Sequence, residues 1–154
     1  AFAGPIAGVG GFAQRGSSGQ LVAGAGELAW VTPEELLERG AAHEQIVWKS
    51  DTDGYDVHLL VAHWSAIDAA CRTLWFEFDP PGTLGPATDI DRLIDLLAAS
   101  GRRVEVWDNL GRRLVALPAG PAVASGLGSI TAWLREQREG HLAVPYVDVW
   151  AFAD

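Results

Sequence analysis

The chain contains no methionine, a single cysteine (Cys71) and a single lysine (Lys49) among its 154 residues. A lone cysteine cannot form an internal disulfide, which is typical of proteins from a reducing compartment. No apolar run approaches the roughly 20 residues that a membrane span requires, and the N-terminal segment lacks the basic flank of a signal peptide. We therefore expect a cytoplasmic protein with no membrane partner.

Basic residues are also scarce, with 11 Lys and Arg against 20 Asp and Glu, which gives a net charge of −9. The arginines are scattered or occur in short pairs, so no basic stripe is present to neutralise a phosphate backbone, and nucleic acid is excluded as a partner. Apolar residues are abundant, at 49% with seven tryptophans. This composition and length predict one folded domain with a substantial core.

Strand and helix patterns alternate along most of the chain. Predicted strands cover residues 45–49, 73–78, 103–108, 112–117 and 145–152, and predicted helices begin near residues 32, 55, 65, 88 and 129. Residues 118–128 are expected to form a loop. The glycine-rich residues 1–29 are expected to be irregular or a hairpin, ahead of an α/β portion over 30–154. Such alternation favours an α/β fold with a largely parallel sheet.

Three helix starts carry capping residues. Thr32 and Glu35 have the spacing of a capping box, and Pro33 suits the first turn. Thr88 begins a second pattern of this kind, and Ser129 is expected to cap the last helix.

The acids that follow the predicted strand 45–49 are the leading candidates for a functional site. Asp51-Thr52-Asp53-Gly54 follows a short apolar run, and ligands of α/β sheets bind outside the carboxyl ends of the strands. Glu77 is the one charge in the apolar run 73–78. A charge inside a covered strand is costly, so Glu77 either faces a pocket or pairs with Arg72 or Lys49.

Two ligand motifs fail on their spacing. Asp51-Thr52-Asp53-Gly54 begins like a calcium loop, but Asp56 stands where glycine is required and Ala62 where glutamate is required, so we expect no metal site of this kind. Gly8-Val9-Gly10-Gly11 has neither the clear preceding strand nor the following helix of a nucleotide-binding loop.

Several segments together resemble the second half of the FkbM-type methyltransferases. The sharpest is Val47-Trp48-Lys49-Ser50-Asp51-Thr52-Asp53-Gly54-Tyr55-Asp56, and the others are Leu74-Trp75-Phe76-Glu77-Phe78-Asp79-Pro80, Ile130–Leu134, Tyr146–Phe152 and Thr32–Leu37. The resemblance covers about residues 30–152.

The resemblance implies a Rossmann-like class I sheet of seven strands, mostly parallel with an antiparallel last strand. Residues 45–50, 73–78, 103–108 and 145–152 would be its fourth to seventh strands. It also implies S-adenosylmethionine as methyl donor and a small-molecule acceptor hydroxyl, on a sugar or a secondary metabolite.

This chain departs from the family pattern in two respects. The family's first strand, glycine-rich cofactor loop and ribose-binding acid lie upstream of the matched region, so we expect the cofactor-binding half to be missing. A partner chain or a second copy is then expected to cover the exposed sheet edge. Asp53 stands where the family more often has glutamate.

On this resemblance we assign Asp51 and Asp53 to catalysis and Glu77 and Asp79 to substrate binding, and we assign no cofactor-binding residues. An acid at a strand end can orient the acceptor hydroxyl, act as its general base, or hold a divalent metal, and these alternatives stay open. The alternative function is a non-catalytic α/β interaction module, either a degenerate methyltransferase relative or an immunity-type binding protein.

Overall fold

The computed structural model describes residues 10–15, 18–23, 31–43, 45–139 and 146–153. Its elements follow in the order β1 (Gly10–Arg15), β2 (Ser18–Ala23), α1 (Pro33–Gly40), β3 (Ile46–Ser50), α2 (Asp56–Ala62), α3 (Trp64–Ala70), β4 (Cys71–Phe78), α4 (Thr88–Ala99), β5 (Arg103–Asp108), β6 (Arg113–Leu117), α5 (Pro121–Glu139) and β7 (Val147–Phe152). Strands β1 and β2 form an antiparallel hairpin of their own.

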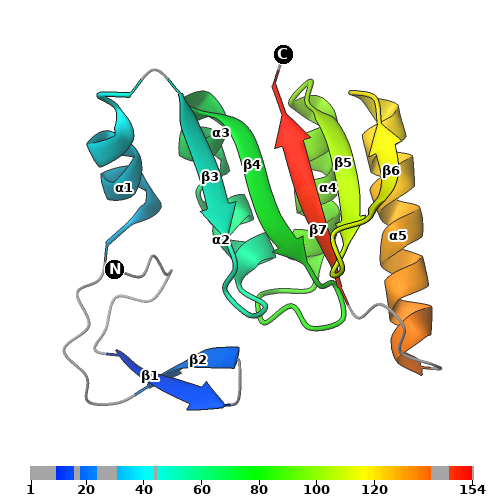
Figure 1. Ribbon diagram of the computed structural model, residues 1–154, viewed down its shortest axis with the longest axis horizontal. Coiled ribbons are helices and arrows are strands. Elements are labelled where there is room, and N and C mark those ends of the chain that lie inside the picture. The colour runs from blue at the N-terminus through cyan, green and yellow to red at the C-terminus, as the bar shows by residue number, and fades with distance from the viewer. Residues whose placement is uncertain (1–9, 16–17, 24–30, 44, 140–145, 154) are drawn as a thin grey trace.

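The main sheet has five strands in the order β3-β4-β7-β5-β6 (Figure 1). Strand β3 is parallel to β4, β7 is antiparallel to both β4 and β5, and β6 is antiparallel to β5. The expected antiparallel last strand is confirmed. The expectation of a largely parallel sheet is wrong, because β7 lies between β4 and β5 and separates two strands that run the same way. The fold is therefore α/β with a mixed sheet.

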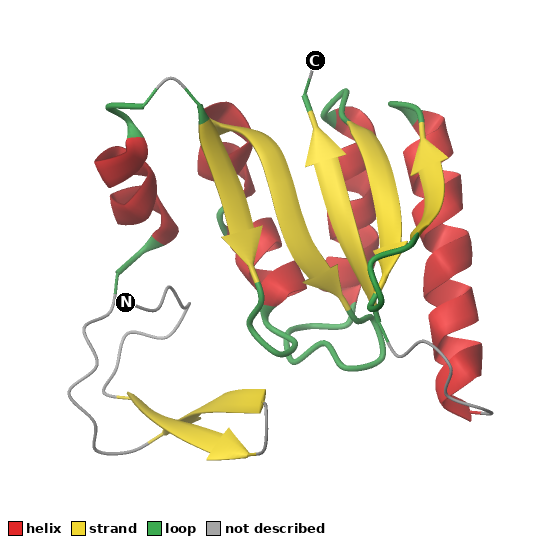
Figure 2. Ribbon diagram, viewed as in Figure 1, coloured by secondary structure: helices red, strands yellow, loops and turns green. Residues whose placement is uncertain are grey.

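Helices α2, α3, α4 and α5 all lie on one face of this sheet (Figure 2). Alternate strand residues point toward them and form the core, among them Leu74, Phe76, Phe78, Val104, Val106, Val147 and Val149, each 0% exposed. Burying each such side chain contributes about 1.5–3 kcal/mol. Among the described residues no helix covers the opposite face, which we call the open face. It carries the other alternate residues, most of them half-buried.

Helix α1 begins as its sequence predicts. The Thr32 hydroxyl accepts from the Glu35 backbone N–H at 3.2 Å, and the Glu35 carboxylate accepts from the Thr32 N–H at 2.9 Å. The cap predicted at Thr88 is wrong, because Thr88 is already helical and Ala87 occupies the cap position without a side-chain bond. The next side chain, Asp89, instead bonds to His58 of α2.

Helix α5 begins at Pro121, so the expected loop over 118–128 and the cap at Ser129 are both wrong. Val123, Leu127 and Leu134 are fully buried at spacings of four and seven residues, which is one helix face. Glycine normally weakens a helix. At Gly126, however, a Cβ would come within 2.6 Å of the Leu117 side chain, so the glycine allows α5 to pack closely against β6.

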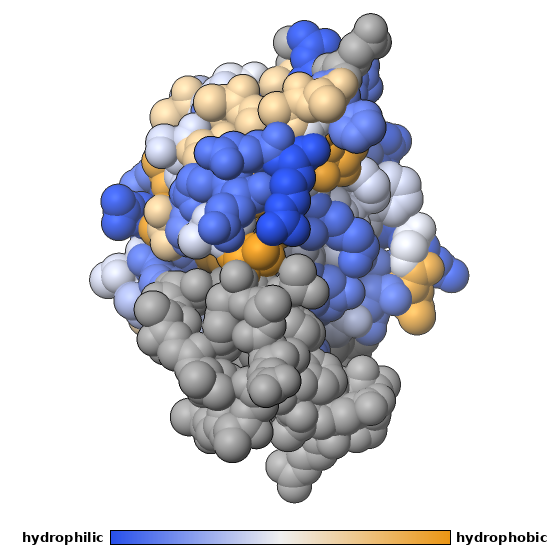
Figure 3. Space-filling view, turned by 90° about the vertical axis from the view of Figure 1, so that its left-hand side faces the viewer, coloured by the Kyte–Doolittle hydropathy of each residue, from blue (hydrophilic) through white to orange (hydrophobic). Residues whose placement is uncertain are grey.

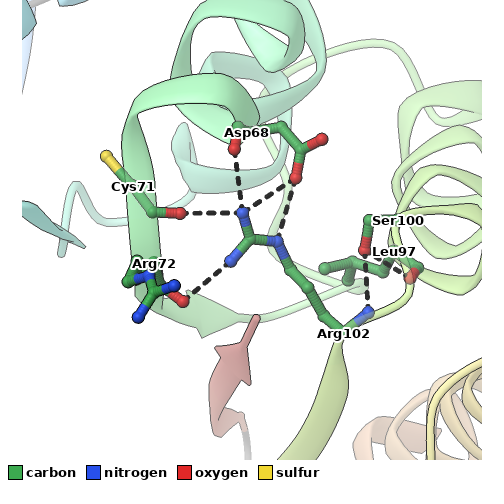
Figure 4. Close-up of polar contacts among 6 residues, drawn as sticks. All are labelled: Asp68, Cys71, Arg72, Leu97, Ser100 and Arg102. Carbon is green, nitrogen blue, oxygen red and sulfur yellow. Dashed lines mark hydrogen bonds and ion pairs between the residues drawn. The ribbon is translucent and has the colours of Figure 1, made fainter. Parts of the chain in front are cut away.

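Arg102, just before β5, joins three segments of the chain (Figure 4). Its side chain is only 2% exposed. The guanidinium donates to the carboxylate and carbonyl of Asp68 and to the carbonyls of Cys71 and Arg72, at 2.8–3.0 Å. These carbonyls lie where α3 ends and β4 begins, so Arg102 fixes that junction against β5.

Candidate functional site

The three strands that share one direction all end at the same edge of the sheet, the carboxyl edge. Strand β3 ends at Ser50, β4 at Phe78 and β5 at Asp108. Strand β7 begins there, since Val147 pairs with both Phe78 and Asp108. The loops that lead to α2 and α4 leave from this edge, which places the sequence-predicted acids together.

The loop from β3 to α2 is tight and firmly held. Asp53 and Gly54 both have positive φ, of 51° and 106°. Gly54 accepts a hydrogen bond from the Leu84 N–H at 2.9 Å, and a Cβ at Gly54 would come within 2.6 Å of the Gly82 carbonyl oxygen. The loop therefore packs on residues 79–87, and only glycine fits at position 54.

Asp56 closes the same loop from the first turn of α2. It is 1% exposed, and one carboxylate oxygen accepts from the Thr52 N–H at 3.0 Å and the Thr52 hydroxyl at 2.8 Å. Burial raises the pKa of Asp56, opposed by the nearby Ser50 and Thr52 hydroxyls. The second carboxylate oxygen and the Ser50 hydroxyl are both buried without a hydrogen bond of good geometry.

Three carboxylates form a row on the open face at the carboxyl edge, which we call the carboxylate row: Asp51, Glu77 and Asp148. Glu77 of β4 pairs directly with Asp148 of β7. The β3–β4 register ends at the pair Ser50–Phe76, so Asp51 follows β3 as Glu77 follows Phe76, and the Asp51 charge acts on Glu77. Like charges directly opposite each other destabilise a sheet. No salt bridge of the described residues joins Glu77 to Arg72 or Lys49, the partners considered from the sequence.

Two carboxylates of the row, Glu77 and Asp148, have raised pKa values. Burial, and then the charges of Asp56, Asp51, Asp79 and Asp53, raise the pKa of Glu77 from 4.5 to about 7. Burial and the Asp51 charge also raise the pKa of Asp148, while the Lys49 ammonium opposes this rise. Glu77 thus exchanges its proton near neutral pH, which suits a general base.

An aromatic pair, Trp75 and Trp150, lies next to the carboxylate row on the open face. The two rings belong to paired residues of β4 and β7 and meet edge-on, with centroids 6.3 Å apart. Phe152 stacks on Trp150 at 6.0 Å. The Lys49 ammonium lies 4.2 Å from the Trp75 centroid and 3.6 Å from the Asp51 carboxylate.

The four site residues predicted from the sequence lie in different environments. Asp51 and Glu77 are brought together in the carboxylate row. Asp53 is exposed in the loop with left-handed backbone, and its charge acts on Glu77. Asp79 accepts a hydrogen bond from the Gly82 N–H at 3.0 Å, so it organises the turn after β4 as well as adding charge.

Sequence reasoning missed Asp148 and Tyr146 as neighbours of these acids. Burial and the charges of Glu77 and Asp148 raise the pKa of Tyr146, the residue just before β7. The alternation of Tyr146, Asp148 and Trp150 along the last strand indicated a common face. It could not indicate which strands β7 would pair with.

A second missed pair lies between two helix starts. His58 Nδ1 of α2 lies 2.6 Å from Asp89 Oδ2 of α4, and Gly85 packs against the His58 side chain. The carboxylate is 9% exposed and the imidazole 25%. This contact joins α2 to α4 beneath the loop 79–87.

The described part of the chain holds no group of three or more His, Cys, Asp or Glu side chains arranged to bind a metal ion. The described loops from β3 to α2, from β4 to α4 and from β6 to α5 carry no Gly-x-Gly pattern. None of the described helices is both long and apolar enough to cross a bilayer.

Comparisons of the chain with protein-family models, with curated proteins and with solved structures find no match. No relative therefore supplies a function, which has to be inferred from the chemistry of the site and from the resemblance seen in the sequence.

Proposed function

We propose that this chain forms the acceptor side of an S-adenosylmethionine-dependent O-methyltransferase of FkbM type, which methylates a hydroxyl of a sugar or secondary metabolite. The carboxylate row carries the proposal. It lies at the carboxyl ends of β3 and β4, where α/β sheets bind their ligands, and it contains a carboxyl group whose pKa is about 7.

Each acid of the row has a role in this proposal. An acceptor hydroxyl must lose its proton when its oxygen gains a methyl group. The Glu77 carboxylate accepts that proton and becomes a neutral carboxylic acid, and the charges around Glu77 favour this uptake. Asp51 and Asp148 accept hydrogen bonds from the acceptor and orient it, and Asp53 and Asp79 strengthen the negative field at the row.

The arrangement of the strands is compatible with this family. The resemblance implies that the closing strand runs against its neighbours, and β7 does so between β4 and β5. Helices follow β3 and β4, as in any α/β unit.

S-adenosylmethionine would supply an electrophilic methyl group. The described loops after β3, β4 and β6 do not fit the whole cofactor, because they provide no glycine-rich turn for its adenosyl and carboxylate groups. Those groups would be held by residues other than the described ones.

Methyl transfer by the natural polypeptide that contains residues 1–154 tests the proposal. We expect the labelled methyl group of S-adenosylmethionine to appear on sugar acceptors. The rate of this transfer should be about 100-fold lower for Glu77→Gln, the loss typical of a missing general base. Asp95→Asn, which removes an exposed carboxylate from α4 on the far side of the sheet, is the matched control and should keep the rate. Equal rates for the two variants would show that Glu77 takes no part in the reaction. No transfer by the wild-type protein would contradict the proposed function.

The second candidate, a non-catalytic interaction module, is favoured by the edge of β3. Among the described strands β3 pairs only with β4, and Val47 is 58% exposed. Viewed from the α1 side, the described surface combines hydrophilic residues with a band of mildly hydrophobic ones and a few strongly hydrophobic spots (Figure 3). An interaction through the β3 edge would use strand addition.

A further inference from the structure

The open face of the sheet carries an apolar stripe that no described helix covers (Figure 2). The outer strands contribute Val47 of β3 and Leu114 of β6, which are 58% and 46% exposed. The three inner strands contribute half-buried aromatic side chains: Trp75, Trp107, Trp150 and Phe152. A sheet face of this composition is normally buried against another layer of structure.

Charged residues of opposite sign lie on the two sides of this stripe. Through the paired residues of β4 and β7, Lys49 of β3 lies at the same level along the strands as Glu105 of β5. One level nearer the carboxyl edge, Asp51 follows β3, and Arg113 lies on β6 at the other side. The sign of the charge therefore reverses from one side of the sheet to the other at both levels.

These charges reach solvent and have capacity for a second contact. Lys49 and Asp51 are 63% and 53% exposed, and Arg113 is 55% exposed. Arg113 donates to the Glu105 carboxylate at 3.3 Å, and a guanidinium has five N–H donors, so it can bind another carboxylate as well. Within one copy Asp51 and Arg113 cannot meet, because four strand spacings, roughly 19 Å, separate β3 from β6.

A second copy, turned by half a turn about an axis parallel to β7, matches this pattern. Strands β3 and β6 are each two strands from β7, so β3 of one copy faces β6 of the other, and β4 faces β5. Asp51 of one copy then meets Arg113 of the other. The Lys49 ammonium, which lies 4.2 Å from the Trp75 centroid on β4, meets Glu105 on the β5 strand of the other copy. Each contact occurs twice, as a two-fold axis requires.

We propose that the open face binds a second copy of this chain, sheet against sheet, with the aromatic stripes of the two copies in contact. Aligned sheets pack about 10 Å apart with their strands about 30° from parallel. The strand spacing and rise give the face a footprint of roughly 400 Å² per copy, and protruding side chains enlarge the area that is buried. The total is on the order of 1,000 Å², which is the lower end of the range for a specific dimer.

The dimer is independent of the proposed methyl transfer. An axis parallel to the strands brings the carboxyl edges of both copies to the same end of the dimer, so the carboxylate row lies at the rim of the interface and an acceptor can reach it. The two Asp148 carboxylates come close to the axis at this rim, where water still solvates them, and their repulsion limits the affinity.

Sedimentation velocity of the chain over a range of concentrations tests the association. The measurement is made at physiological salt, which screens the net charge of −9 on each copy beyond about 8 Å. We expect a reversible monomer–dimer equilibrium. A chain that stays monomeric would show that another polypeptide covers the open face, and the inference would be lost.

Two charge reversals locate the interface. Asp51→Arg and Arg113→Asp each place like charges at both copies of one contact, so each variant alone should dimerise about tenfold more weakly. In an equimolar mixture the two altered residues face each other and the second contact stays native, so the affinity should return to about that of the wild type. A purely structural defect within either copy would not be repaired by mixing.

Two matched controls carry the same charge changes on the helical side of the sheet. Asp95→Arg on α4 and Arg135→Asp on α5 are at exposed positions and should dimerise like the wild type. Circular dichroism establishes that each variant is folded. A dimer that both open-face reversals leave unchanged would place the contact elsewhere, such as at the β3 edge. A mixture that associates as weakly as the single variants would equally contradict the face-to-face arrangement.

Discussion

Glu77 and Asp148 lie directly opposite each other on antiparallel strands, with both carboxylates on the open face of the sheet. A pair of like charges in this position destabilises a sheet. Partial burial adds to the cost by raising the pKa of both groups. The fold therefore tolerates an unfavourable pair at the edge where ligands of such sheets bind.

The acidity of Glu77 predicts how stability depends on pH. The pKa is about 7 in the folded chain and 4.5 ordinarily, so the folded state binds more protons between these values. The contribution of Glu77 to the free energy of unfolding then falls as the pH rises from 4.5 through about 7. Glu77→Gln removes this contribution. We expect the variant to match the wild type below pH 4.5 and to be more stable above pH 7, by on the order of 1 kcal/mol after allowance for partial exposure.

Urea denaturation across this pH range measures the difference. The control, Asp95→Asn, should follow the wild-type profile, since Asp95 is exposed on α4. A Glu77→Gln variant that is less stable than the wild type above pH 7 would contradict the sign worked out above.

Arg102 predicts a large loss of stability on substitution. Arg102→Met leaves the partly exposed Asp68 carboxylate without its partner and three backbone carbonyls without their donor. Each buried acceptor left without a donor costs about 1–3 kcal/mol. Arg102→Lys should recover little, because one ammonium cannot span acceptors that a planar guanidinium reaches together. Chemical denaturation gives both values. Arg135→Met, at an exposed position of α5, is the control and should change stability by less than about 0.5 kcal/mol.

Two glycine substitutions should have opposite effects. Gly54→Ala forces a side chain into left-handed backbone and against the Gly82 carbonyl, so we expect a loss of more than about 2 kcal/mol. Gly128→Ala lies within α5 with open space around it, so it should stabilise the chain by about 0.5–1 kcal/mol. Thermal unfolding measures both changes. A harmless Gly54→Ala would mean that the loop which presents Asp51 and Asp53 is not held as described.

The local elements could be predicted from the sequence because their signals are local. The apolar run that ends at Ser50, the capping box of Thr32 and Glu35, and the strand over 103–108 all appear at or within a residue of the expected positions. The start of α5 could not be predicted in this way, because the glycines after Pro121 have a low helix propensity and favour a loop. Tertiary packing of Val123 and Leu127 overrides that propensity.

The site was only partly predictable for a different reason. Asp51 and Asp53 follow a strand, so their position at the carboxyl edge follows from chain direction alone. Asp148 lies about 70 residues beyond Glu77 along the chain, and its place beside Glu77 depends on β7 entering between β4 and β5. The contact of His58 with Asp89 likewise depends on how α2 and α4 pack, and periodicity within either helix carries no information on it.

The central position of β7 also constrains the order in which the sheet can assemble. Strands β3 and β4 can pair early during synthesis, and so can β5 and β6, but the two pairs share no hydrogen bonds. They are joined only when residues 147–152 emerge and supply a ladder to each side. Until then both inner edges are open to other chains, so the nascent protein is most prone to aggregate just before this last strand is made.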